Sequence, residues 1–359
     1  MVKFTIYTGG YTSFIVSYLF DTQTSTLTYL DTIATSANPS WLKQHPTNEN
    51  IIYAVNEVGP LGVLQAYATT PGGGLTLLDE VSSGGNGPAF CAPLSSDRVA
   101  IMNYGSGDGE VIPTVDGGTK FDNSTSVLVE FTPPPGGASN PHMALEHGNE
   151  VFVPDLGGDN IWRIGSVGGP GSGDFSIHGF IEHPKGTGPR HMAILGDDMY
   201  VLHETANTLT KQAIPPFPNG TSPIVATVST LAADRPANAT FAAAELLLPP
   251  PSRAYPAPLL YASNRNIGGT PDARGDTIGI FAPAAPLRAV RQVYTGLVQI
   301  RGMALGAGEA GEAYLVALGA VSGGMVVYKR TEGGYNLEEV ARNASAVPRT
   351  TLVMLPLRG

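Results

Sequence analysis

Short runs of alternating apolar and polar residues, separated by polar turns, recur along the chain. Most share one order, in which a small residue and a proline precede a short apolar run, a polar turn and an alternating strand. Four stretches read NPSWLKQHPTNENIIYAVNE, GPAFCAPLSSDRVAIMNY, NPHMALEHGNEVFVPDL and GPRHMAILGDDMYVLHE, and IRGMALGAGEAGEAYLVAL follows them less closely. Period-two alternation bounded by turn residues predicts strands. We therefore expect antiparallel strand pairs here.

The repeat has a spacing of about 50 residues, which is typical of a four-stranded propeller blade. Its units begin near Asn38, Gly87, Asn140, Gly188, residue 244 and Ile300. The terminal stretches FTIYTGGYT and TLVMLPL remain strand-like and unpaired, so they can complete a seventh blade. The sequence predicts an all-β, seven-bladed β-propeller of four-stranded antiparallel blades, one domain over residues 1–359, closed by its two terminal strands. Two β-sandwiches would not explain the recurring opening.

Composition supports this fold and narrows the partners. The chain has 45 Gly and 30 Pro, and it lacks long runs of helix-favouring residues. Its formal net charge of −10 comes without a basic cluster, which argues against nucleic acid as a partner. No apolar run approaches about 18 residues, so no membrane partner is expected. A single cysteine, Cys91, excludes an internal disulfide framework.

The repeat also allows its polar positions to be counted. The residues after the small-Pro pair are Ser40, Ala89, His142 and Arg190. Second strands end at Asn56, Asn103, Asp155, His203 and Asn264, and the next residues include Glu57, Tyr104, Glu204 and Arg265. In an up-and-down blade the first strand starts at the end where the second strand finishes. Both sets should therefore reach one rim of the propeller, near its axis.

Three consecutive blades thus bring ionisable residues to that rim. We predict that four of them are catalytic: His142, Arg190, Glu204 and Arg265. An alternative is that the arginines and Glu204 form ion pairs that lock neighbouring blades. Candidate substrate contacts beside this group are Asp155, His191, His203 and Asn264.

The sequence predicts that this site works without metal or cofactor. The chain contains no H-E-x-x-H motif, no calcium-binding loop and no G-x-S-x-G elbow. Its glycine-rich stretches GSGDGE and GGPGSG do not follow a strand and open a helix, as nucleotide-binding loops do.

At these residues the chain resembles the lactonase family of seven-bladed propellers, which includes bacterial 6-phosphogluconolactonases and fungal 3-carboxy-cis,cis-muconate cyclases. The resemblance runs from YTGGYT through NPHMAL, GPRHMAI and LLYASNR to GMVVYKR. It implies a metal-free central site containing His142, Arg190, Glu204 and Arg265, with Arg301 as a further substrate-binding arginine. The resemblance also extends to secreted fungal aldonolactonases. GPAFCAPL lacks the histidine that is common in the family after this small-Pro pair, which puts recognition of a phosphate or of several carboxylates in doubt.

Two reactions fit these residues. A lactonase would open a sugar lactone, such as gluconolactone or cellobionolactone, with Glu204 as a base whose pKa burial raises. Arg190 and Arg265 would hold the carbonyl oxygen, and His142 would protonate the leaving oxygen. A cyclase would instead close a muconate into a lactone. The acidic chain and its two or three rim arginines suit a neutral sugar lactone better than a tricarboxylate.

A third hypothesis is a non-catalytic propeller that binds a protein or glycan on its rim. It would predict exposed aromatic residues at repeated loop positions, whereas Trp41 and Trp162 fall in strand-like runs.

The compartment and assembly are less constrained. Sequons start at Asn123, Asn219, Asn238 and Asn343, and MVKFTIYTGGYT has no leader-like apolar region. We expect an extracellular protein whose leader has been removed, with a cytoplasmic protein as the alternative. The oligomeric state stays open, with a monomer favoured.

Overall fold

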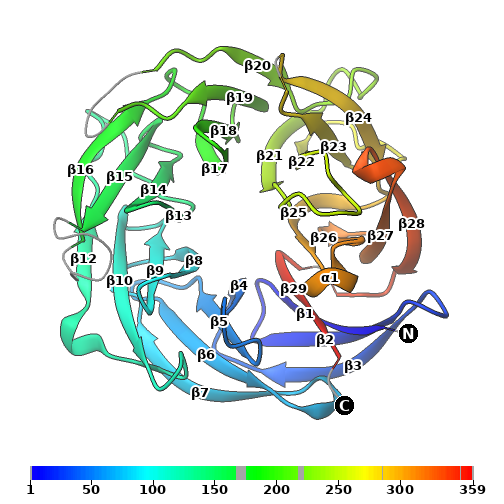
Figure 1. Ribbon diagram of the computed structural model, residues 1–359, viewed down its shortest axis with the longest axis horizontal. Coiled ribbons are helices and arrows are strands. Elements are labelled where there is room, and N and C mark those ends of the chain that lie inside the picture. Colours follow the sequence, from blue (N-terminus) through cyan, green and yellow to red (C-terminus); the bar gives the residue numbers. More distant parts are fainter. Residues whose placement is uncertain (1, 167–174, 217–221, 285, 348, 358–359) are drawn as a thin grey trace.

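Seven β-sheets stand in a ring around a central axis, as Figure 1 shows for the computed structural model. The structure describes residues 2–166, 175–216, 222–284, 286–347 and 349–357. Each sheet is one blade, and its strands follow one another from the axis outwards. The prediction of an all-β, seven-bladed propeller is therefore confirmed.

The blade that closes the ring contains both ends of the chain. Its strand order from the axis is β29, β1, β2 and β3, which span Thr351–Pro356, Lys3–Gly9, Phe14–Asp21 and Thr26–Ala34. β29 and β1 are antiparallel, with Phe4 opposite Pro356 and Gly9 opposite Thr351. The two terminal stretches thus complete the seventh blade, as the sequence predicts.

The other six blades follow in chain order, each with its innermost strand first. The second contains β4 (Pro39–Gln44), β5 (Ile51–Asn56), β6 (Val63–Thr69) and β7 (Leu75–Ser82). The third contains β8 (Pro88–Leu94), β9 (Arg98–Asn103), β10 (Asp108–Val115), β11 (Lys120–Phe121) and β12 (Val127–Glu130). The fourth contains β13 (Leu145–His147), β14 (Glu150–Asp155), β15 (Asn160–Ser166) and β16 (Phe175–Glu182).

The last three blades complete the ring. The fifth contains β17 (Pro189–Leu195), β18 (Asp198–His203), β19 (Thr208–Ala213) and β20 (Ala226–Ser229). The sixth contains β21 (Thr240–Leu247), β22 (Leu260–Gly268), β23 (Thr277–Ala282) and β24 (Arg288–Tyr294). The seventh contains β25 (Val298–Leu305), β26 (Tyr314–Ser322), β27 (Met325–Thr331) and β28 (Asn336–Asn343).

The apolar core of the described chain lies between neighbouring blades rather than at one centre. Its buried residues form seven clusters, and each cluster joins two blades that are neighbours in the ring. Phe4 of β1 and Val327 of β27 share the cluster that joins the first and last blades. Because both faces of a blade are covered, most second strands are apolar throughout, as in IIYAV of β5.

The helical segments of the described chain are short and lie in the connections between strands. They are α1 (Gly308–Gly311), η1 (Pro71–Gly73), η2 (Asn123–Thr125) and η3 (Glu332–Gly334). Among the described residues, no helix has the length and apolar character that crossing a membrane requires.

The sequon asparagines differ in accessibility. Asn123 and Asn238 are exposed, on η2 and on the loop before β21. Asn343 is half-buried, and its side-chain amide donates a hydrogen bond to the Leu27 carbonyl. Asn219 lies outside the described residues. Of the three sequon asparagines that the structure describes, Asn123 and Asn238 are therefore the accessible ones.

Candidate functional site

The small-Pro pair starts the inner strand of several blades. The backbone conformation at its first position explains why a small residue stands there. Asn38, Gly87 and Gly188 have φ angles of 57°, 62° and 65°. This left-handed conformation is strained for most side chains but accessible to glycine and asparagine. The chain uses it where it turns from the outer strand of one blade into the inner strand of the next.

Directly after this pair the inner strand bulges. The strand register shifts across Ser40, Ala89 and Arg190, so each is an extra residue that lacks an opposite partner. A similar shift surrounds Arg301 on β25. A β-bulge bends its strand and can redirect the side chain of the extra residue. The bulges therefore give repeated positions where a side chain can leave the sheet for the axis.

His142 occupies the equivalent place in the fourth blade. Pro141 pairs with Asp155 in an isolated bridge, and Leu145 pairs with Phe152. The inner strand thus advances one residue further than β14 between these pairs, which again leaves an extra residue. His142 follows the proline in sequence, as Arg190 does in the fifth blade.

Glu204, which directly follows β18, is the centre of a cluster of charged side chains that includes Arg190 and Arg265. Its Oε2 lies 2.6 Å from Nε of Arg190, and its Oε1 lies 2.8 Å from a terminal nitrogen of Arg265. The Arg190 contact is a charge contact rather than an aligned hydrogen bond. Arg190 and Glu204 come from the fifth blade and Arg265 from the sixth. The ion pairs expected under the blade-locking alternative are therefore present.

These contacts decide the ionisation of Glu204. Burial raises the pKa of Glu204, but the positive charges of Arg190 and Arg265 act against it, and the net pKa is lowered. The expectation that burial brings this pKa up towards neutrality is wrong, because both carboxylate oxygens face a guanidinium group. Burial lowers the pKa of Arg190 to about 10, so Arg190 stays protonated at neutral pH.

Arg301 lies on the seventh blade and extends the cluster. Its guanidinium lies 3.8 Å from Oε2 of Glu57, which in turn accepts a hydrogen bond of 3.1 Å from the Tyr11 hydroxyl. The side chains of Arg301 and Glu57 are 22% and 20% exposed, and Tyr11 is 50% exposed. This part of the cluster is therefore open to solvent and loosely held.

His142 is buried beside these charges. Its ring meets Tyr104 nearly edge-on, at a centroid distance of 5.8 Å. Its Nδ1 has no hydrogen-bond partner among the described residues. Burial, together with the positive charge of Arg190, holds the pKa of His142 well below 6.5. His142 is therefore a neutral imidazole at pH 7.

Three of the predicted substrate contacts lie away from this cluster. Asp155 and His203 are fully buried at the ends of β14 and β18. Asn264 is also fully buried, but β22 continues beyond it to Gly268, so the prediction that this strand ends at Asn264 is wrong. Asp155 accepts four hydrogen bonds, His203 contacts Thr210 at 3.1 Å, and Asn264 exchanges hydrogen bonds with Thr230. Contacts within the protein thus hold these three side chains. In the fifth and sixth blades it is the next residue along the chain, Glu204 or Arg265, that reaches the cluster.

His191, the fourth predicted contact, lies behind Arg190. Its Nε2 is 3.5 Å from a terminal nitrogen of Arg190, and its Nδ1 is 2.8 Å from Oε1 of Glu245. Sequence reasoning did not single out Glu245 or Tyr11. Glu245 is a lone acid in the apolar stretch FAAAELLL, and this isolation is the signal that could have found it.

Comparison with known proteins identifies the family of this chain. The family described as "Lactonase, 7-bladed beta-propeller" matches residues 4–355. No curated protein matches the chain.

Solved structures with the same fold include three bacterial proteins, and each match covers 99% of this chain and 100% of the other. A periplasmic gluconolactonase of Pseudomonas aeruginosa is 19% identical with a TM-score of 0.81. A Lactobacillus plantarum protein is 21% identical with a TM-score of 0.80, and a candidate 6-phosphogluconolactonase of Bacteroides uniformis is 23% identical with a TM-score of 0.78. At these identities the likeness shows the fold alone.

Proposed function

Because the chain belongs to the lactonase family of seven-bladed propellers, we propose that it hydrolyses a sugar lactone to the aldonic acid at the cluster around Glu204. The observation that carries this proposal is the convergence of Arg190, Arg265 and Arg301 beside a neutral His142. Fixed cationic donors next to a neutral base suit ester hydrolysis, in which a carbonyl oxygen becomes negative.

The charge of the cluster favours a neutral substrate. Arg190, Arg265 and Arg301 carry three positive charges, of which Glu204 and Glu57 balance two. The remaining single charge matches the one oxyanion that forms from a neutral lactone. A tricarboxylate would bring three negative charges into this partly buried place, where each unpaired charge is costly. This balance supports hydrolysis of a sugar lactone over the muconate cyclase reaction.

The roles of the side chains follow from their contacts. His142 takes a proton from water as the water oxygen attacks the lactone carbonyl, and it returns that proton to the ring oxygen when the carbon–oxygen bond breaks. The arginines stabilise the oxyanion, and one well-placed donor contributes about 3 kcal/mol to such a step. Glu204 holds Arg190 and Arg265 in place, because its two oxygens are already engaged by them.

The proposal is tested by offering the purified protein gluconolactone, cellobionolactone and 3-carboxy-cis,cis-muconate separately. We expect acid release from at least one sugar lactone above its spontaneous hydrolysis, and no loss of diene absorbance from the muconate. Turnover of the muconate alone would favour the cyclase, and turnover of none would favour a propeller that only binds.

The acid–base state of His142 predicts a particular pH dependence. A histidine with a lowered pKa is able to accept a proton at every pH above that pKa. We therefore expect kcat/KM to stay constant from pH 6.5 to about 8 and to fall only as the pH drops below 6.5 through the lowered pKa of His142. A pH-stat assay corrected for spontaneous hydrolysis measures this profile. A midpoint at or above 6.5 would contradict the assignment of His142 as the base.

A further inference from the structure

A cavity of about 540 Å³ follows the axis on the side opposite the Glu204 cluster. Its walls come from the inner strands, and they are mostly apolar: Leu42, Phe90, Leu247, Met303 and Met354. This volume lies within the range of ordinary small-molecule sites. We call it the axial cavity.

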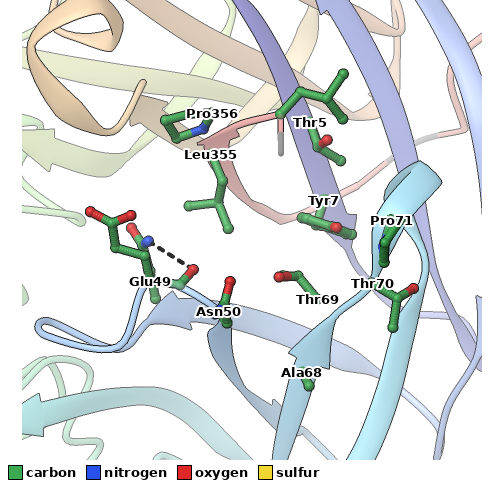
Figure 2. A pocket seen from close by; sticks show the side chains of 12 residues that line it. Thr5, Tyr7, Glu49, Asn50, Ala68, Thr69, Thr70, Pro71, Leu355 and Pro356 are labelled. Atoms are coloured by element: carbon green, nitrogen blue, oxygen red, sulfur yellow. Dashed lines mark hydrogen bonds between the residues drawn. The ribbon is translucent and has the colours of Figure 1, made fainter. Parts of the chain in front are cut away.

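A second cavity of about 420 Å³ lies beside the axial cavity and shares Gln44, Glu49 and Leu355 with it. Figure 2 shows this side cavity, with Leu355 and Glu49 on the shared wall and Tyr7, Thr69 and Thr70 across from them. Its lining is rich in hydroxyl and amide groups, unlike that of the axial cavity. The axial cavity therefore has a polar side chamber near its mouth.

The inner end of the axial cavity carries a buried carboxylate. Glu245 lines the cavity and is 4% exposed. Its Oε1 lies 2.8 Å from Nδ1 of His191 and accepts a hydrogen bond of 3.2 Å from the backbone of Leu246. Its Oε2 receives no hydrogen bond from the described part of the chain. This oxygen is not sealed inside the protein but opens into the cavity, where a donor group of a ligand can reach it.

The proton of His191 can be placed from its neighbours. A terminal nitrogen of Arg190 points its hydrogen at Nε2 of His191, since an arginine can only donate. The imidazole proton therefore lies on Nδ1, facing Glu245. Burial lowers the pKa of His191, which agrees with this neutral form. A neutral His191 leaves the negative charge of Glu245 without a direct ionic partner.

The nearby charges do not neutralise Glu245. Arg190 is already paired with Glu204 on the other side of His191. Lys43 and Glu49 line the mouth and have opposite charges. Trp41 and Phe90 pack against each other, and each meets the His191 ring edge-on, so the inner end has aromatic walls. The inner end thus combines one negative charge with apolar and aromatic surface.

We propose that the axial cavity is a second binding site, which takes a small amine with an apolar or aromatic body and pairs its ammonium with Oε2 of Glu245. An ammonium supplies both the donor and the positive charge that this carboxylate lacks. The body of the amine packs on the aliphatic walls and on the rings of Trp41 and Phe90. This site lies behind the proposed lactonase cluster, with His191 between Glu245 and Arg190, and the proposal does not rest on lactonase activity.

Isothermal titration calorimetry of the intact protein with benzylamine and benzyl alcohol tests the proposal. The two probes share one body, and only the amine carries a charge at pH 7. We expect saturable binding of benzylamine, about tenfold or more tighter than that of the alcohol. Glu245→Gln should remove this preference, whereas Glu309→Gln, an exposed acid on α1 near the mouth, should leave it unchanged.

Ala307→Trp fills the mouth of the axial cavity without touching Glu245, and it should abolish binding of both probes. If Glu245→Gln does not fold, the Ala307→Trp variant still tests whether benzylamine binds in the axial cavity. The proposal is wrong if benzylamine does not bind, if the alcohol binds as tightly as the amine, or if Ala307→Trp binds benzylamine normally.

Discussion

Glu204→Gln lowers kcat for lactone hydrolysis by about 100-fold or more while the protein keeps its fold. Glutamine preserves the shape of the side chain but removes the charge that holds Arg190 and Arg265 at 2.6 and 2.8 Å. It also turns an amide group towards one of these guanidiniums, and two donors cannot pair. Steady-state kinetics on the lactone that the wild type hydrolyses fastest measures the effect.

Glu338→Gln is the matched control, because Glu338 is an exposed glutamate on the outer strand β28. It should retain wild-type activity. The pH profile of residual activity separates two roles for Glu204. If Glu204 positions the arginines, the residual activity still falls in acid through His142. Full activity of Glu204→Gln would show that its ion pairs serve only to link the two blades.

Asp155→Asn lowers the free energy of unfolding by about 3 kcal/mol or more. One oxygen of Asp155 accepts hydrogen bonds from the backbone nitrogens of Asn140 and Gly158, at 2.7 and 2.8 Å. The other accepts from Ser139 and Trp162, at 2.6 and 2.9 Å. Whichever way the asparagine amide turns, its NH₂ group faces two donors. Urea unfolding followed by circular dichroism measures the loss.

The exposed turn residue Asp197 provides the comparison, since Asp197→Asn removes the same charge without a buried network. It should leave the unfolding midpoint unchanged. The activity of the remaining folded Asp155→Asn protein is equally informative. Near-normal kcat/KM supports a structural Asp155, whereas full stability with lost activity would support the substrate contact that the repeat register predicts.

The fold could be predicted from the sequence because the repeat records the geometry of one blade. In three of the four small-Pro pairs the small residue has a left-handed backbone, as at Gly87 and Gly188 with φ angles of 62° and 65°. Counting from it locates the rim positions. The leftover strands at the two ends predicted the closing of the ring, which β1 and β29 confirm.

The site could be predicted less completely, because the sequence register does not give the direction of each side chain or its contacts with other blades. The register brought Asp155 and Glu204 equally near the rim, but successive strand residues point to opposite sides. Asp155 therefore lies within its own blade, whereas Glu204 reaches the axis. The lowered pKa of Glu204 depends on Arg265 from another blade, which no local pattern specifies. Glu245 lies in a unit without the small-Pro opening, so its register could not be counted.

The pairing of β29 with β1 has a consequence for how the protein is made. Because β29 is synthesised long after β1, the axial edge of the first blade stays open while the chain between them is translated. An open strand edge invites pairing with other chains. Contacts between residues this far apart also form slowly. The first blade therefore lacks its axial strand until β29 has been synthesised.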